Sequence, residues 1–203
     1  MLCYCSFQTL FLRTKLLFLF VTLWTTFPLL AQDAQNTLQV ISAKQTQEIT
    51  EKYTYLENTI EVFKDEKGNT SFEEVAANDA LFWENNTKES FEADKVYWMK
   101  LNLQAGEHYR DTCLFYVGSI ESWEKIEAYL IHEDGRVEQQ QAGTGLAMIN
   151  NFIPDDFNEI IGFGLDSTEN ARLYIRVEGV RVGHTHTYLS LWARRVKELS
   201  PFL

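Results

Sequence analysis

Apolar and polar residues alternate along the stretch KVYWMKLNLQ, residues 95–104. A period of two is typical of a β-strand, whose side chains point to opposite faces in turn. One face is expected to carry Tyr97, Met99, Leu101 and Leu103, and the other Trp98, Lys100, Asn102 and Gln104. The tryptophan on the polar face is either covered by another part of the chain or offered to a ligand.

Short segments of the same kind follow one another through the rest of the chain. They read VYWMKLNLQ, TCLFYVGS, KIEAYLIHE, RVEQQQAG, EIIGFGLD, ARLYIRVEG and TYLSLWARR. Gly, Asp, Asn or Ser separates them, and few connections are long enough for a crossover helix, so we expect antiparallel pairing. The dipeptide Asp134-Gly135 predicts a two-residue hairpin turn. The pattern predicts an all-β antiparallel sandwich.

One segment favours a helix instead, TSFEEVAANDALF at residues 70–82. Thr70 or Ser71 can cap it, and Glu73 and Glu74 suit its first turn. A strand and a turn are expected just before it, within residues 53–69.

The start of the chain has the layout of a signal peptide. Arg13 and Lys15 precede the apolar run LLFLFVTLW, and we expect cleavage after Ala31. The apolar stretch is shorter than the roughly 20 residues of a spanning helix, which disfavours a membrane anchor. The predicted division is a signal peptide at 1–31, a polar leader with one short strand at 32–52, a sandwich domain at 53–193 and a tail at 194–203.

Composition and charge limit the classes of partner that the chain can bind. With 203 residues and 45% hydrophobic content, the chain can build one ordinary core. Its net charge of −11 argues against nucleic acid, and removal of the signal peptide makes the charge more negative still. Cleavage also leaves Cys113 as the single cysteine, so no internal disulfide is expected, and its apolar strand indicates a small buried hydrophobe.

Six phrases now stand in an order that carries a resemblance. They are YLEN (55–58), SFEEV (71–75), VYWMKLNL (96–103), KIEAYLIHEDG (125–135), AGTGL (142–146) and LYIRVEG (173–179). Together they resemble the N-terminal extracellular sensor domain of bacterial seven-transmembrane receptors with diverse intracellular signalling modules (7TM-DISM). The resemblance covers about residues 53–193.

The resemblance implies a jelly-roll-like β-sandwich, similar to carbohydrate-binding modules, on the outer side of the inner membrane. It also implies a small ligand, with a carbohydrate-like molecule as the candidate, and membrane helices followed by an intracellular output. Two features depart from the family pattern. The sequence stops where the first membrane helix is expected, and AMINNFIPDDF follows GTGL where a basic residue is expected.

Five residues are candidates for ligand binding: Trp98, Lys100, Tyr129, Tyr174 and Arg176. An aromatic face suits the C–H surface of a sugar ring, and nearby polar groups can bind its hydroxyls. The alternative is that Trp98 anchors packing and that the other four form cross-strand pairs on a solvated face.

Metal sites and catalysis receive less support. His184 and His186 form a two-ligand start for zinc or copper, with His108 and His132 as the other histidines, but a polar turn is favoured. Asp155, Asp156 and Glu159 lack the spacing of a calcium loop and are expected to be solvated. No nucleophile, phosphate or dinucleotide motif is found. We therefore expect no enzyme, no cofactor and no metal.

The functional expectation is an exported, periplasmic ligand-binding sensor module that passes its signal to a membrane receptor or a protein partner. The alternative is a structural or protein-interaction module of the periplasm without a small-molecule ligand.

Overall fold

The computed structural model describes residues 36–42, 45–56, 59–84, 91–92, 94–109, 111–118, 123–143, 160–180, 186–187 and 191–196. The predicted signal peptide lies outside these residues. Within the described ranges, no helix has the length and apolar character needed to cross a bilayer.

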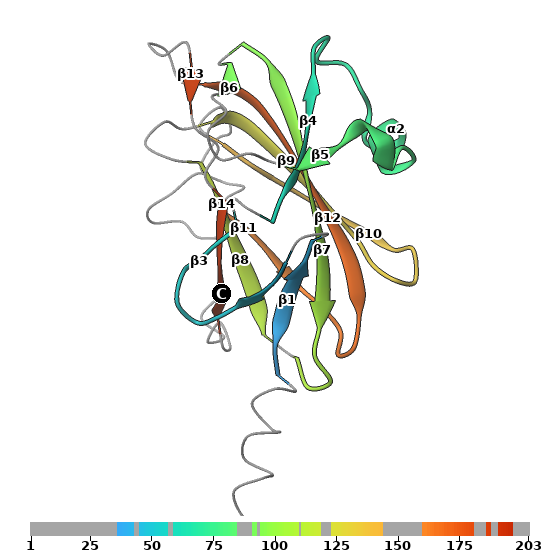
Figure 1. Ribbon diagram of the computed structural model, residues 1–203, viewed down its shortest axis with the longest axis vertical. Coiled ribbons are helices and arrows are strands. Elements are labelled where there is room, and N and C mark those ends of the chain that lie inside the picture. The colour runs from blue at the N-terminus through green and yellow to red at the C-terminus, as the bar shows by residue number, and fades with distance from the viewer. Residues whose placement is uncertain are drawn as a thin grey trace, which may run out of the picture.

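A large antiparallel sheet forms most of the fold (Figure 1). Its strands are β1 (Leu38–Ile41), β2 (Thr46–Ile49), β4 (Glu61–Asp65), β5 (Trp83–Glu84), β7 (Val96–Ala105), β9 (Trp123–Ile131), β10 (Val137–Ala142) and β12 (Asn170–Val180). The order is β10-β9-β12-β7-β1-β2, with β4 on β7 and β5 on β4. One edge of β7 is thus shared, by β4 along its first half and by β1 along its second.

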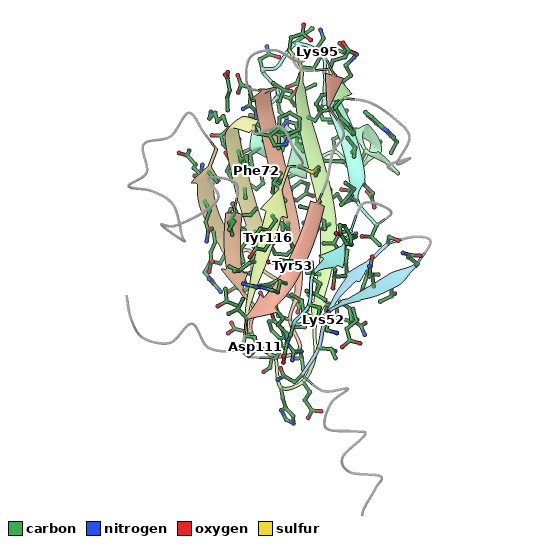
Figure 2. The ribbon with its side chains drawn as sticks, turned by 90° about the vertical axis from the view of Figure 1, so that its left-hand side faces the viewer. Lys52, Tyr53, Phe72, Lys95, Asp111 and Tyr116 are labelled. Carbon is green, nitrogen blue, oxygen red and sulfur yellow. The ribbon has the colours of Figure 1, made fainter. Side chains whose placement is uncertain are left out.

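A smaller sheet packs against the large one. It contains β11 (Ile160–Gly164), β8 (Thr112–Val117), β14 (Leu191–Val196) and β3 (Thr54–Tyr55), in that order. Strands β6 (Phe91–Glu92) and β13 (His186–Thr187) form a separate pair. Figure 2 shows the side of the small sheet, where the ring of Tyr53 lies against that of Tyr116 with centroids 5.5 Å apart.

The core lies between the two sheets. Tyr97, Met99, Leu101 and Leu103 of β7 belong to it, as the alternation predicts. Phe115 and Leu191 of the small sheet belong to the same cluster. Every recorded strand pair is antiparallel, so the predicted all-β sandwich with one short helix is confirmed.

Helix α2 (Phe72–Ala76) is the predicted helix, followed by the 3₁₀-helix η1 (Asp79–Leu81). Of the two capping candidates, Ser71 is the cap. It accepts from the backbone N–H of Glu74, whose side chain accepts from the N–H of Ser71. This reciprocal capping box fixes the start of a helix too short to be stable by itself.

The turn before α2 is held by a buried carboxylate. Asp65 accepts from the backbone N–H groups of Thr70 at 2.7 Å, Gly68 at 2.9 Å and Lys67 at 3.2 Å. Although burial raises the pKa of Asp65, these three donors outweigh it and hold the pKa below its usual value. The segment from 66 to 82 is thereby directed back over the large sheet.

Two predicted boundaries differ from the arrangement of the strands. The leader at 32–52 was expected to contain one short strand, but it contains both β1 and β2, and β1 pairs with β7. The leader is mostly polar, and in its described part the buried apolar residues are Leu38, Val40 and Ile49, so its sequence pattern is weak. At the other end, β14 continues to Val196, so the first residues of the predicted tail belong to the small sheet.

The predicted hairpin between β9 and β10 exists, but the two-residue turn is wrong. His132 donates its N–H to the carbonyl of Arg136, so the loop contains three residues, Glu133 to Gly135. Gly135 has φ +87°. A three-residue loop needs a left-handed residue at this position, which glycine adopts without a steric cost.

Candidate functional site

The five predicted site residues lie together on one face of the large sheet. We call this the outer face, because it is opposite the small sheet. Trp98 pairs in register with Arg176, and Lys100 pairs with Tyr174, which in turn pairs with Tyr129. The sequence places these residues on polar strand faces, and the register of β7, β12 and β9 brings them side by side.

Part of the outer face is covered by residues 70–82, the cover segment, which contains α2 and η1 (Figure 1). The ring of Phe72 stacks on that of Tyr129 with centroids 4.2 Å apart. Val75 and Phe82 of the cover segment belong to the same cluster as Trp98 and Tyr174. Trp98 is only 1% exposed. The cover segment therefore buries Trp98, and the ring is not offered to a ligand.

Lys100 is also buried, and its charge is paired. Its Nζ lies 2.9 Å from the Glu61 carboxylate and 3.2 Å from that of Asp79 in η1. Burial lowers the pKa of Lys100, but the two carboxylates outweigh it and hold the pKa above its usual 10.5. Lys100 thus ties the cover segment to the sheet as a cation.

Arg176 is paired in the same way. Its Nη1 lies 3.2 Å from Glu127 and 2.5 Å from Glu178. Its Nη2 donates to the carbonyl oxygen of Gly68 at 3.2 Å, in the turn that leads to α2. Both Lys100 and Arg176 therefore use their donors on the protein itself.

Two buried polar atoms beneath the cover segment have no hydrogen-bond partner among the described residues: Trp98 Nε1 and the Tyr174 hydroxyl. Burial raises the pKa of Tyr174, and the nearby guanidinium of Arg172 opposes the rise. Buried polar atoms normally have a hydrogen-bond partner. Since these two atoms have none among the described residues, packing and not hydrogen bonding holds this cluster together.

Beside the cover segment, the outer face opens into a pocket of about 400 Å³. Its lining comprises Ile41, Asn102, Leu103, Ile131, His132, Glu133, Asn170, Ala171 and Arg172. Four of these form one row across four adjacent strands, Ile41 on β1, Asn102 on β7, Arg172 on β12 and Ile131 on β9. The volume is in the range that holds a small ligand.

Arg172 is one of several pocket residues that are not among the five predicted site residues. It shares the outer face with Tyr174 and Arg176, two and four residues further along β12. The strand period could have identified it with them. Asn102 did appear on the predicted polar face of β7.

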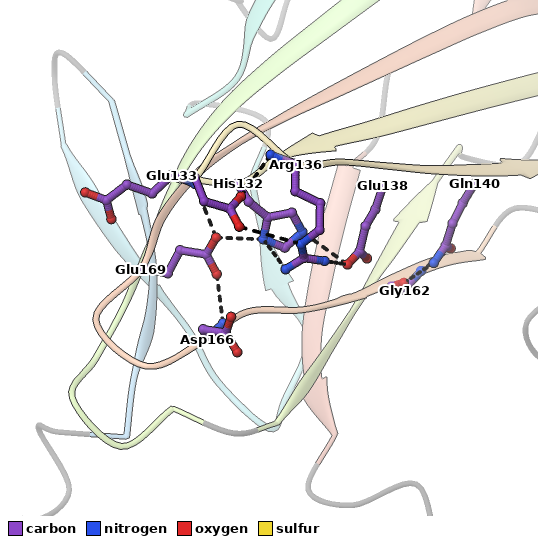
Figure 3. Close-up of polar contacts among 9 residues, drawn as sticks. His132, Glu133, Arg136, Glu138, Gln140, Gly162, Asp166 and Glu169 are labelled. Carbon is purple, nitrogen blue, oxygen red and sulfur yellow. Dashed lines mark hydrogen bonds and ion pairs between the residues drawn. The ribbon is translucent and has the colours of Figure 1, made fainter.

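One wall of the pocket is fixed by a buried histidine (Figure 3). His132 Nδ1 lies 2.6 Å from Glu169 Oε1, and His132 Nε2 lies 3.1 Å from Glu138 Oε1. Glu169 also accepts the backbone N–H of Asp166 at 2.8 Å and that of Glu133 at 3.3 Å. These contacts fasten the β9–β10 hairpin to the loop before β12. They give the wall that carries Glu133 and Asn170 a fixed position.

Metal ligation finds no support in the part of the chain that the structure describes, where no three His, Cys, Asp or Glu side chains are grouped for a metal. His186 lies in β13. His184, Asp155, Asp156 and Glu159 lie outside the described residues. Cys113 is buried in β8, and burial raises the pKa of its thiol.

The fold and the pocketed face define an antiparallel β-sandwich domain with a candidate binding surface on its larger sheet. The model of the 7TMR-DISM extracellular 2 family matches residues 57–193. The chain belongs to this family of extracellular sensor domains, as the ordered phrases of the sequence indicate. No curated protein matches the chain.

Two solved structures show a distant likeness. The GH31 α-xylosidase from Xanthomonas citri matches at 10% identity with a TM-score of 0.34, over 81% of this chain. A carbohydrate-binding module of the β-sandwich superfamily matches at 12% identity with a TM-score of 0.29, over 72% of this chain. The chain spans 16% and 56% of the length of these two proteins. Both TM-scores are too low to define a shared fold.

Proposed function

We propose that the chain is an exported sensor module that binds a small, carbohydrate-like molecule in the outer-face pocket. The observation that carries the proposal is the pocket itself. A row of side chains from four adjacent strands forms its floor, and the fastened β9–β10 hairpin forms its wall.

The chemistry of the pocket suits a hydroxylated ring. Ile41 and Ile131 are apolar and half-buried, and they flank the floor. Between and beside them, Asn102 and Asn170 each offer an amide donor and an amide acceptor. A sugar ring presents C–H surface and hydroxyl groups together, so it needs this mixture of apolar and amide groups.

The five predicted site residues have a supporting role in this proposal. Trp98, Tyr129 and Tyr174 form the packed layer beneath the cover segment. Lys100 holds that segment in place, and Arg176 holds the turn before it. Arg172 of the pocket lies next to Tyr174 of this layer. A ligand that contacts Arg172 would therefore alter the packing beneath the cover segment through Tyr174. We propose that this contact passes the signal on, to membrane helices or to a protein partner, on the outer face of the inner membrane. The proposed role is binding and not catalysis.

Thermal shift of the purified protein with a broad panel of small molecules, which includes neutral sugars and sugar acids, tests the proposal. We expect at least one sugar to raise the melting temperature, because a ligand that binds only the folded state stabilises it. Asn102→Ala should abolish the shift. Gln141→Ala is the matched control, because it removes an exposed amide of β10 outside the pocket. If no small molecule shifts the melting temperature, the proposal is wrong.

The second candidate is a protein-interaction module. It is favoured by two exposed aromatic residues at the edge of the small sheet, Tyr53 at 48% and Tyr55 at 64%. Edge strands with exposed apolar groups are prone to pair with other chains. Size-exclusion chromatography with light scattering distinguishes the two: an oligomer that Tyr55→Ser dissociates supports this candidate, and a strict monomer opposes it.

A further inference from the structure

We propose that Arg172 binds a carboxylate, so that the pocket selects a sugar acid over a neutral sugar. The inference rests on the proposed function, because it assigns the ligand class of the same pocket. It goes further in naming the residue that discriminates between ligands and the ligand group that this residue recognises.

Arg172 differs in its partners from two other cations of the outer face, Lys100 and Arg176. Lys100 and Arg176 each contact two carboxylates of the protein. Arg172 lies on the same face, is exposed to the pocket, and forms no ion pair with any described residue. This is unexpected in a chain with 29 acidic and 18 basic residues, where acidic partners are abundant.

Arg172 occupies a central position in the floor of the pocket. In register it stands between Asn102 on β7 and Ile131 on β9. A guanidinium is a planar fork that binds a carboxylate through two parallel N–H···O bonds. A ligand seated on this row would place a carboxylate over Arg172 and its hydroxyls within reach of the amides.

The wall of the pocket carries an acidic residue. Glu133 also lines the pocket, and its Oε2 accepts the backbone N–H of Asn170 at 3.3 Å. A carboxylate on the wall accepts hydrogen bonds from hydroxyl groups but repels a second anionic group. The pocket therefore fits one carboxylate, at Arg172, beside several hydroxyls, and this is the layout of a sugar acid.

The charge of the protein bears on which ligands the pocket retains. The protein as a whole is strongly negative and disfavours anions at long range. An acidic ligand is retained only if a local contact outweighs this repulsion. A neutral sugar leaves the exposed guanidinium of Arg172 to water, whereas a carboxylate gains a charge-assisted, bidentate contact with it.

Isothermal titration calorimetry of the purified protein with D-glucuronate and with D-glucose tests the inference. We expect glucuronate to bind about 10- to 100-fold more tightly than glucose, the usual range for one charge-assisted contact. Arg172→Gln should remove this preference, and Arg172→Lys should restore part of it. Lys67→Gln removes the same charge from an exposed turn outside the pocket, and it should leave the preference intact.

The other outcomes separate the two proposals. If glucose and glucuronate bind equally and Arg172→Gln changes neither, the carboxylate inference is overturned and sugar binding stands. If neither compound binds, the carboxylate inference is overturned. If a broad panel of small molecules also fails to shift the melting temperature, the proposed function fails with it.

Discussion

Replacement of Trp98 by alanine tests whether this residue belongs to the packing or to an exposed platform. Trp98 is 1% exposed and lies in a cluster with Val75 and Tyr174. Its ring also stacks on that of Tyr129 with centroids 6.1 Å apart. A fully buried aromatic ring of this size costs about 3–5 kcal/mol of unfolding free energy when it is cut back to alanine. Since each kcal/mol lowers the melting temperature of a chain this long by about 2–4 °C, we expect a fall of about 6–20 °C.

The indole N–H refines the prediction. Trp98 Nε1 has no hydrogen-bond partner among the described residues, so Trp98→Phe loses no hydrogen bond and keeps most of the packing. We expect the phenylalanine variant to lose only about 1–2 kcal/mol. A much larger loss would show that the N–H has a partner in solution.

Urea unfolding followed by far-UV circular dichroism measures both variants, because fluorescence changes when a tryptophan is removed. The slope of free energy against urea should stay constant, so that a shifted midpoint reports stability. Trp83→Ala is the control, since Trp83 is 39% exposed and should cost less than about 2 kcal/mol. If Trp98→Ala costs no more than Trp83→Ala, Trp98 is not buried by the cover segment and the account of the outer face is refuted.

Three further predictions concern the turn, a glycine and the thiol. The pKa of Asp65 is depressed in the folded state, so its stabilising effect is fully present well above pH 3.8 and is lost as the pH falls through the lower folded-state pKa. In urea unfolding, the stability gap between wild type and Asp65→Asn should therefore be wide at pH 7 and should narrow as the pH falls below 3.8. Gly143 has φ +117°, and a Cβ added there would lie 2.6 Å from the Glu124 carbonyl oxygen. Gly143→Ala should therefore lower the melting temperature by several degrees. Gly164→Ala is the control and should change the melting temperature little, because a Cβ at Gly164 meets open space. Because Cys113 is buried and its pKa is raised, iodoacetamide at pH 8 should label it only when urea unfolds the protein, and rapid labelling of the folded protein would contradict its position.

Local chemistry made several elements predictable. Alternation along β7 assigned Met99 and Leu101 to the core, and SFEEV predicted the helix that Ser71 caps. Both signals act over a few residues and do not depend on distant partners. The two strands of the leader were harder to predict, because they are held by strand pairing more than by their own composition. β1 pairs with β7, and β2 pairs with β1.

The candidate site was only half predictable for the same reason. The period of two placed Lys100 and Arg176 on polar strand faces, but nothing local showed that both are neutralised by partners far along the chain, Glu61 for Lys100 and Glu127 for Arg176. Nor did it show that Arg172 would differ from them by having no such partner.

The sequence by itself determined the sandwich class, the helix and the family, because these depend on periodicity, capping and the order of short phrases. Only the tertiary structure decided that Trp98 is covered, that Lys100 and Arg176 are paired, and that Asn102 and Arg172 share the floor of a pocket. Strand register and the path of the cover segment bring residues together across 39 positions between Glu61 and Lys100 and 49 between Glu127 and Arg176. Contacts at such separations are set by how the whole chain packs, and no local pattern encodes them.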